Sequence, residues 1–166
     1  FQVTGISGTT LAHAAAADAN TSTNLSKAYA VGARVYEAHE TTFSIQNDPS
    51  SGVPTLYREV IGESAQPLVE GIENLQVLYG EDTDADADGT NGDGTANRYV
   101  AFGTSGLDID RIVSVRISLL VRSINNNLTT EPAPYTFNGS TVTPVATDKY
   151  LRKVFTTTVT LRNKAG

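Results

Sequence analysis

The residues best placed to do chemistry are aspartates in one short segment. Asp84, Asp86, Asp88 and Gly89 stand at positions one, three, five and six of an EF-hand-like loop. This spacing lets three carboxylates converge on one hard cation, while the glycine makes the sharp turn. Thr90 would then supply a backbone carbonyl oxygen. The segment therefore predicts a Ca²⁺ site.

The predicted site departs from the standard loop at its end. Position twelve, where the standard loop has a bidentate glutamate, is Thr95. Asp82 or Asp93 would supply the missing carboxylate from outside the standard frame. Such a site is expected to bind Ca²⁺ in the roughly 10⁻⁴–10⁻³ M range of extracellular modules. The alternative is a solvated acidic loop that holds no ion.

The acidic segment accounts for the net charge of the chain. The sequence has 18 Asp and Glu against 12 Lys and Arg, a net charge of −6. Residues 81–94 hold six of the acids and no base, so the remaining 12 acids balance the 12 bases. No basic stripe is left to neutralise phosphates, which argues against nucleic acid as a partner.

No catalytic constellation is recognisable in the sequence. His13 and His39 are the only histidines, and neither sits in a known motif. A Gly-x-Ser-x-Gly elbow is absent, and the lack of cysteine excludes thiol nucleophiles and Cys-based zinc sites. Glu70 and Glu73 could do acid–base work as a pair, but a solvated face is the simpler interpretation. We therefore predict a protein without enzymatic activity.

Two strands are expected to hold the ends of the acidic segment. Leu75, Val77 and Tyr79 alternate with other residues and predict a strand that stops at Gly80. Residues 98–102 again have the composition of a strand. The stretch 81–96 cannot bury apolar surface, so we expect a surface loop between the two strands. A helical turn is expected just before the first strand, over residues 69–73.

The remaining chain is also rich in strand signals. The expected pieces are an opening hairpin over 1–13, a strand over 30–45 paired with 56–61, a long strand over 112–123, a hairpin broken at Asn138-Gly139, and a closing strand over 151–162. We expect Phe155, Val159 and Leu161 of the closing strand to point inward. The 166 residues suffice for one domain with a core. Together the pattern predicts one mainly β domain over 1–166, with antiparallel sheets, sandwich-like, and little helix.

Four stretches resemble the C-terminal region of PilW-type minor pilins of bacterial type IV pili. They are LVEGIENLQVLYGEDTDADADG, ANRYV, RIVSVRISLLVRS and YLRKVFTTTVTLRN. The resemblance implies a pilin- or pseudopilin-type globular domain and a structural role. It also implies a low-copy subunit at or near the pilus tip that initiates assembly. Its partners would be other minor pilins and the major pilin.

The start of the chain differs from that of a pilin. Pilins begin with an apolar helix whose fifth residue is Glu, whereas Phe1 is followed here by Gln2, Val3, Thr4 and Gly5. We therefore expect the distal part of a longer subunit, without its N-terminal assembly helix. Only that absent helix would touch a membrane, by anchoring the subunit in the inner membrane before it reaches the extracellular pilus.

Two alternatives to the pilus role are open from the sequence. J-type pseudopilins of type II secretion share a looser version of the same strand pattern. A calcium-stabilised surface adhesin or binding module is the alternative of a different class, with the acidic loop organising a ligand pocket. The chain lacks the tryptophan that sugar-binding sites favour.

Overall fold

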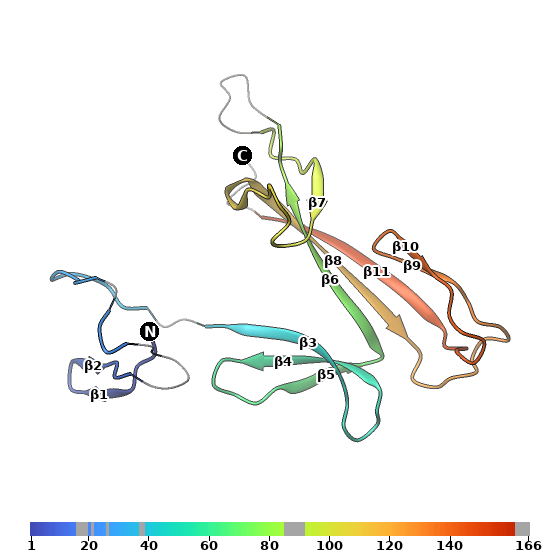
Figure 1. Cartoon of the computed structure of the whole chain (residues 1–166), viewed down its shortest axis with the longest axis horizontal. Helices are drawn as coiled ribbons and strands as arrows, with labels where there is room; N and C mark the ends of the chain where they lie inside the picture. Colours follow the sequence, from blue (N-terminus) through green and yellow to red (C-terminus); the bar gives the residue numbers. More distant parts are fainter. Residues whose placement is uncertain (16–19, 21, 26, 37–38, 85–91, 162–166) are drawn as a thin grey trace. The chain divides into compact units, whose positions relative to one another are not determined.

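The computed structural model describes residues 1–15, 20, 22–25, 27–36, 39–84 and 92–161 of the chain. These residues form two compact units, Phe1–Ala38 and His39–Gly166, and each is described here by itself. Strands make up nearly all of the regular structure, and every strand pair is antiparallel (Figure 1). The predicted mainly β class is confirmed. That residues 1–166 form a single domain stays a prediction.

The first unit contains the predicted opening hairpin. Strands β1 (Gly5–Ser7) and β2 (Thr10–Ala12) pair around a turn in which Gly8 has a φ of 57°. The buried Asn20 side chain fastens the hairpin, since its Oδ1 accepts from the Gln2 N–H at 2.8 Å and its Nδ2 donates to the Gln2 carbonyl at 2.7 Å.

The strand predicted over 30–45 forms only at its end. Gly32 lies in a turn closed by the Ala33 N–H and the Ala30 carbonyl, and strand structure begins at Thr41. The predicted strand would run through Gly32 in an extended conformation. Its φ of 92° instead suits the turn, which ends the extended run.

A three-stranded sheet opens the second unit. Its strands are β3 (Thr41–Asn47), β4 (Pro54–Val60) and β5 (Gln66–Glu70), in the order β3-β4-β5. Asp48 organises the β3–β4 turn, because its Oδ1 accepts the N–H groups of Ser50 and Ser51, each at 2.9 Å. Its Oδ2 accepts the Tyr57 hydroxyl at 3.0 Å, which ties the turn to the neighbouring strand.

Gly71 joins this sheet to the next one. The Gly71 N–H donates to the Pro54 carbonyl of β4, and the Gly71 carbonyl accepts the Arg122 N–H of β8 (Ile112–Arg122), both at 2.7 Å. Its φ is 81°, and a Cβ at this position would lie 2.6 Å from the Arg122 carbonyl oxygen. Only glycine fits this corner. The helical turn predicted over 69–73 is therefore wrong: β5 runs into a glycine corner and then into β6 (Ile72–Glu81).

The second sheet has four strands in the order β11-β8-β6-β7, with β7 (Arg98–Val100) and β11 (Arg152–Thr160) at its edges. Strand β8 lies in the middle and pairs over most of its length with both β6 and β11. A single 3₁₀ turn, η1 (Ile109–Arg111), leads into β8. The strands predicted around 75–79, 98–102, 112–123 and 151–162 are thus confirmed, and β6 and β7 hold the two ends of the acidic loop.

A small hairpin follows the long loop after β8. Strands β9 (Tyr135–Phe137) and β10 (Ser140–Val142) pair around Asn138 and Gly139, whose φ angles are 49° and 78°. Positive φ at both central residues defines the turn that Asn-Gly favours, as the sequence predicts.

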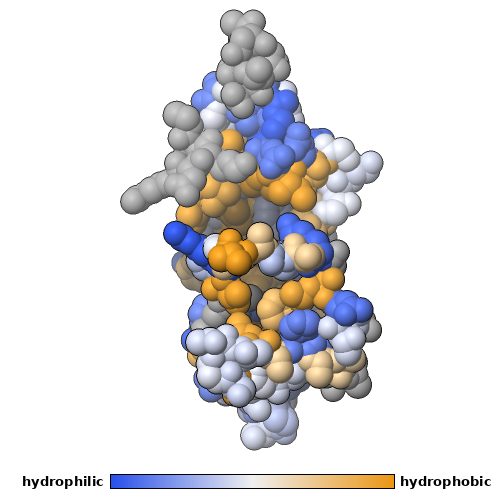
Figure 2. Space-filling view, turned by 90° about the vertical axis from the view of Figure 1, so that its left-hand side faces the viewer, coloured by the Kyte–Doolittle hydropathy of each residue, from blue (hydrophilic) through white to orange (hydrophobic). Residues whose placement is uncertain are grey.

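The buried core is small for the size of the chain. Its hydrophobic members among the described residues are Val53, Tyr57, Ile72, Ile112, Val113, Leu120 and Phe137. Phe155, Val159 and Leu161, which were predicted to point inward, are 50%, 52% and 36% exposed. Figure 2 likewise shows hydrophobic surface open to solvent between hydrophilic patches. Within the part that the structure describes, no helix is long and apolar enough to cross a membrane.

Candidate functional site

Asp82 is the fixed point of the acidic loop. It follows directly after β6 and is only 3% exposed. Its Oδ1 accepts the Asp84 N–H at 3.1 Å and its Oδ2 accepts the Gly94 N–H at 2.7 Å. Gly92 packs against this carboxylate so closely that any Cβ there would overlap it. One buried side chain therefore holds both the outgoing and the returning end of the loop.

Asp84 is held in place by the residue that precedes β7. The Asn97 Nδ2 donates to the Asp84 Oδ2 at 3.0 Å, and the Asn97 Oδ1 accepts the Thr83 N–H at 2.6 Å. The Arg111 guanidinium donates to the Asp84 carbonyl oxygen. On the returning side, the Asp93 Oδ1 accepts the Thr95 N–H at 2.8 Å.

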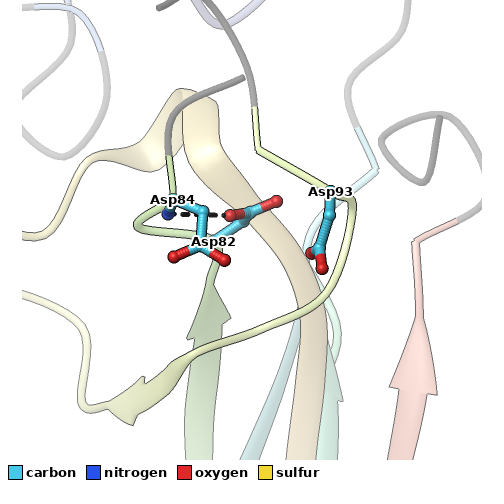
Figure 3. Close-up of side chains that lie close together, drawn as sticks. All are labelled: Asp82, Asp84 and Asp93. Carbon is cyan, nitrogen blue, oxygen red and sulfur yellow. Dashed lines mark hydrogen bonds between the residues drawn. The ribbon is translucent and has the colours of Figure 1, made fainter. Parts of the chain in front are cut away.

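These contacts bring three carboxylates together. Asp82, Asp84 and Asp93 each offer an oxygen, and these oxygens lie within 4.8 Å of one another (Figure 3). Calcium binds oxygen at 2.3–2.6 Å, so two ligands of one ion are at most about 5 Å apart. The spacing of the three carboxylates therefore fits a shared calcium ion.

The structure gathers only part of the predicted ligand set. Asp86, Asp88 and Thr90 lie outside the described residues. Asp82 and Asp93, which the sequence places outside the standard frame, both come next to Asp84. Sequence reasoning missed Asn97 and Arg111, since nothing in a pattern of aspartates points to the amide and guanidinium that position the chain around them.

Glu81, the last residue of β6, stabilises the base of the loop. It is buried, and its Oε2 pairs with Arg98 at 2.7 Å while its Oε1 accepts the Asp108 N–H at 3.1 Å. Burial alone would raise the pKa of this carboxyl. The hydrogen bonds from Asp108 and Arg98, and the charges of Arg98 and Arg111, outweigh burial and hold the pKa below its usual value.

Asp108 and Asp110 do not join the cluster of carboxylates. Asp108 caps the η1 turn, its Oδ1 accepting the Asp110 N–H at 3.0 Å. The group of metal-capable side chains among the described residues also contains neither histidine. His13 lies in the first unit, where its ring meets the Phe1 ring edge-on.

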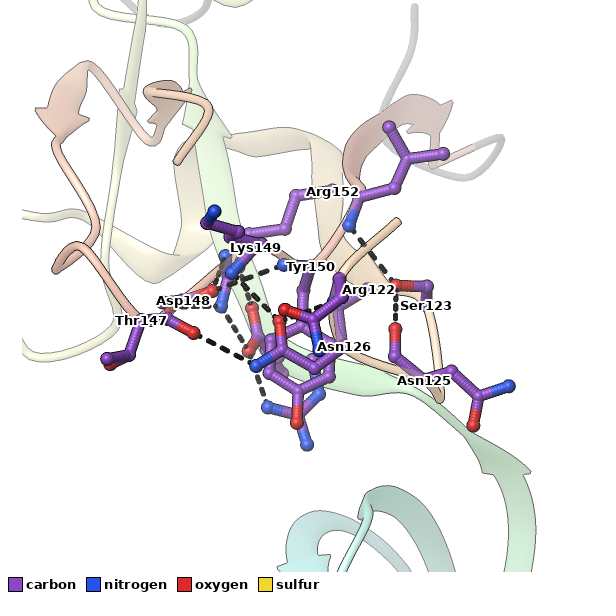
Figure 4. A network of polar contacts seen from close by, with 12 residues as sticks. Arg122, Ser123, Asn125, Asn126, Thr147, Asp148, Lys149, Tyr150 and Arg152 are labelled. Carbon is purple, nitrogen blue, oxygen red and sulfur yellow. Dashed lines mark hydrogen bonds and ion pairs between the residues drawn. The ribbon is translucent and has the colours of Figure 1, made fainter. Parts of the chain in front are cut away.

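A second polar cluster lies at the opposite end of the four-stranded sheet (Figure 4). Arg152 is central to it, with a side chain only 6% exposed. The Arg152 guanidinium donates to Glu73 at 2.6 and 2.9 Å and to Asp148 at 2.8 and 2.9 Å. Arg122 pairs with the same Glu73 at 3.2 Å and stacks 4.1 Å above the Tyr150 ring.

The second cluster is balanced in charge. Two carboxylates face two guanidinium groups, so there is no surplus charge to attract an ion. The hydrogen bond from Arg152 lowers the pKa of Asp148, and the hydrogen bond to Glu73 raises the pKa of Arg152. Asn126 completes the attachment, because its Nδ2 donates to the Thr147 carbonyl at 3.0 Å and its Oδ1 accepts the Lys149 N–H at 2.9 Å. This cluster fastens the loop between β8 and β11 to the sheet.

Both polar clusters lie within a region that comparison with known families identifies. The PilW family model, described as type IV pilus-assembly protein W, matches residues 42–163, from the start of β3 to beyond the end of β11. No curated protein and no solved structure matches the chain. The family match covers most of the chain and contains both sheets and both polar clusters. The chain therefore belongs to the PilW family of type IV pilus-assembly proteins.

Proposed function

We propose that the chain is a structural part of a minor pilin that acts in the initiation complex at the pilus tip. The observation that carries the proposal is the family match over 42–163, which takes in the whole second unit except its ends. The form of that unit supports it. Sheets with exposed edges and exposed apolar side chains offer surfaces for neighbouring subunits.

The partners in this role are other minor pilins and the major pilin. The protein would act outside the cell, on the pilus, after being anchored in the inner membrane before assembly. It would carry out no catalysis. A type II secretion pseudopilin and a calcium-stabilised adhesin are the competing roles, and each predicts a different outcome of the experiment below.

The test is removal of the full-length protein from a piliated host, with complementation by the intact gene. We expect few sheared surface pili without the protein, and copurification of the tagged protein with minor pilins. Normal piliation together with a block in secretion would indicate the pseudopilin role. Normal piliation with reduced adhesion would indicate the adhesin. Either result would overturn the proposal.

We also propose that the acidic loop binds Ca²⁺ through Asp82, Asp84 and Asp93. Asp86, Asp88 and Thr90 would complete the ligand set. The proposal is supported by the closeness of the three described carboxylates and by the way Asp82 and Asn97 hold the loop ends. The ion would offset the repulsion among the carboxylates and cross-link the outgoing and returning halves of the loop.

Calorimetric binding and thermal unfolding test this second proposal. For a dissociation constant of 10⁻⁴–10⁻³ M, 10 mM Ca²⁺ should stabilise the chain by about 1.4–2.7 kcal/mol, and a chelator should reverse the shift. Asp93→Asn should reduce this stabilisation, whereas the control Glu131→Gln, on an exposed loop, should preserve it. Equal responses in both variants, or none in the parent chain, would contradict calcium binding at these residues.

A further inference from the structure

Strand β11 has an open edge. It is the outermost strand of the four-stranded sheet and pairs only with β8 among the described strands. The Leu161 N–H donates to the Val113 carbonyl, and the Ser123 N–H donates to the Leu151 carbonyl. The odd-numbered residues of β11 therefore direct their backbone groups towards β8. By the alternation of an antiparallel ladder, the even-numbered residues direct theirs outward.

This edge lacks the features by which proteins usually block pairing. Exposed edges are normally interrupted by proline, by a bulge, or by a charge along the strand. From Val154 to Thr160 the strand contains none of these, and its register with β8 is regular throughout. Its residues from Phe155 onwards are exposed on both faces of the sheet. Strand β9 packs against β11 beside Arg152 but does not pair with it, so the outward backbone groups of β11 are left for another strand.

The sequence of the edge is complementary to itself. Around Thr157 the chain reads Val-Phe-Thr-Thr-Thr-Val-Thr, with Phe155 and Val159 at equal distances on the two sides. We propose that a second copy of this chain binds here, β11 against β11, antiparallel, about a two-fold axis through Thr157. The two sheets then become one continuous sheet.

The backbone fits this register. An antiparallel pair centred on Thr157 places Thr156 opposite Thr158 of the other copy, and Val154 opposite Thr160. All four are even-numbered, so each facing pair has outward N–H and C=O groups to exchange. If the register shifted by one residue, the outward N–H and C=O groups of one copy would lie opposite residues of the other copy whose groups point towards its own β8. The axis must therefore pass through a residue and not between two residues.

The side chains select Thr157 among the permitted centres. With the axis there, Phe155 faces Val159 on one face of the sheet, an aromatic and β-branched pair of the kind that stabilises cross-strand contacts. An axis through Thr156 would instead place Phe155 opposite Thr157 and Lys153 opposite Val159. That register loses the apolar pair. An axis through Thr158 would pair Phe155 only with Leu161, which lies beyond the end of β11.

Charge also favours an antiparallel second copy. The sheet end where β11 starts is nearly balanced, with Arg122, Lys149, Arg152 and Lys153 against Glu73, Glu131 and Asp148. The end where β11 stops carries the acids Glu81, Asp82, Asp84, Asp93, Asp108 and Asp110 against Arg98 and Arg111. An antiparallel pair keeps the acidic ends of the two copies apart, which favours this orientation over a parallel one. This association does not depend on the pilus role.

Cysteine cross-linking of the 166-residue chain tests the register directly, since the chain has no cysteine of its own. Thr157 faces itself as a non-hydrogen-bonded pair, whose Cα separation of about 4.5 Å suits a disulfide. Under mild oxidation Thr157→Cys should form a covalent dimer at least about tenfold faster than the control Thr141→Cys on exposed β10. Equal rates for the two variants would overturn the proposal.

Sedimentation with a charge swap provides the second test. The parent chain should dimerise in a concentration-dependent way, and Thr157→Lys or Thr157→Glu alone should weaken dimerisation about fivefold or more, because like charges then face each other. Mixing the two variants should restore association, which separates the effect from misfolding. Thr141→Lys should leave association unchanged. A chain that is monomeric at every concentration tested, or a mixture that stays monomeric, would show that this edge does not bind a second copy.

Discussion

Replacing Glu73 by glutamine removes the charge that two arginines share. Glu73 accepts from Arg152 at 2.6 and 2.9 Å and pairs with Arg122 at 3.2 Å, and these contacts link β6, β8 and β11. Glutamine has nearly the same shape, so packing is preserved. What changes is that the buried Arg152 loses one of its two anionic partners.

The expected cost follows from the burial of the arginine. Removing one partner of a buried ion pair costs about 3–5 kcal/mol, because the remaining charge is left uncompensated. Here Asp148 still pairs with Arg152, so we expect Glu73→Gln to lower the free energy of unfolding by about 2–3 kcal/mol. For a chain of 166 residues this corresponds to a fall in the melting temperature of roughly 4–12 °C.

Urea unfolding followed by circular dichroism measures this loss. The matched control is Glu70→Gln, an exposed position of neighbouring β5, which should change stability by less than about 0.5 kcal/mol. A double-mutant cycle with Arg152→Met should give a coupling energy of about 1–2 kcal/mol. A Glu73→Gln variant as stable as the control, or a coupling energy near zero, would refute a stabilising role for this cluster.

The remaining predictions concern backbone geometry and pH. Gly71→Ala should destabilise the chain by about 1–3 kcal/mol more than Gly62→Ala in denaturant titrations. Both glycines have positive φ, but only at Gly71 would a Cβ meet a carbonyl oxygen. Equal losses of stability would show that the corner tolerates a side chain. The pKa of Glu81 is lowered in the folded state, so its ionised carboxylate stabilises the fold. This stabilisation is complete at a pH above the usual glutamate pKa of about 4.3, and it is lost as the pH falls through the lower pKa of the folded state. Stability measured between pH 5 and about 3 should therefore fall less steeply in Glu81→Gln than in the parent chain, and parallel curves would exclude Glu81 as a source of the acid sensitivity.

Alternation along the chain was sufficient to predict the long strands. Residues 112–123 and 151–162 follow a period of two closely enough that the observed β8 and β11 differ from the predicted ranges by no more than two residues at either end. The Asn138-Gly139 turn was predictable for a similar reason, since few residue pairs accept positive φ at both positions.

Burial was not predictable from the same alternation. A period of two shows which residues share a face, but not whether anything covers that face. Phe155 and Val159 do lie on one face of β11, yet they are half exposed because β11 is an edge strand. The helical turn predicted over 69–73 failed because Leu68, Ile72, Leu75 and Tyr79 match helical spacing by coincidence.

The acidic loop could be predicted as a candidate site but not in its detail. The density of aspartates identified the segment, and the EF-hand-like frame identified Asp84. The contact between Asp82, Asp84 and Asp93 depends on how β6 and β7 bring the loop ends together, with Asn97 and Gly92 beside them. Such contacts between residues on the two sides of a loop leave no periodic trace in a sequence.

The corner at Gly71 has a mechanical consequence. Gly71 donates its N–H to the first sheet, and its carbonyl oxygen accepts an N–H from the second, so no flexible linker separates the two sheets. A pulling force applied to β3–β5 is passed to β6 and β8 through two hydrogen bonds of 2.7 Å and a single peptide unit. In a filament under tension, the two sheets would bear the load together, and rupture in force spectroscopy should occur as one event.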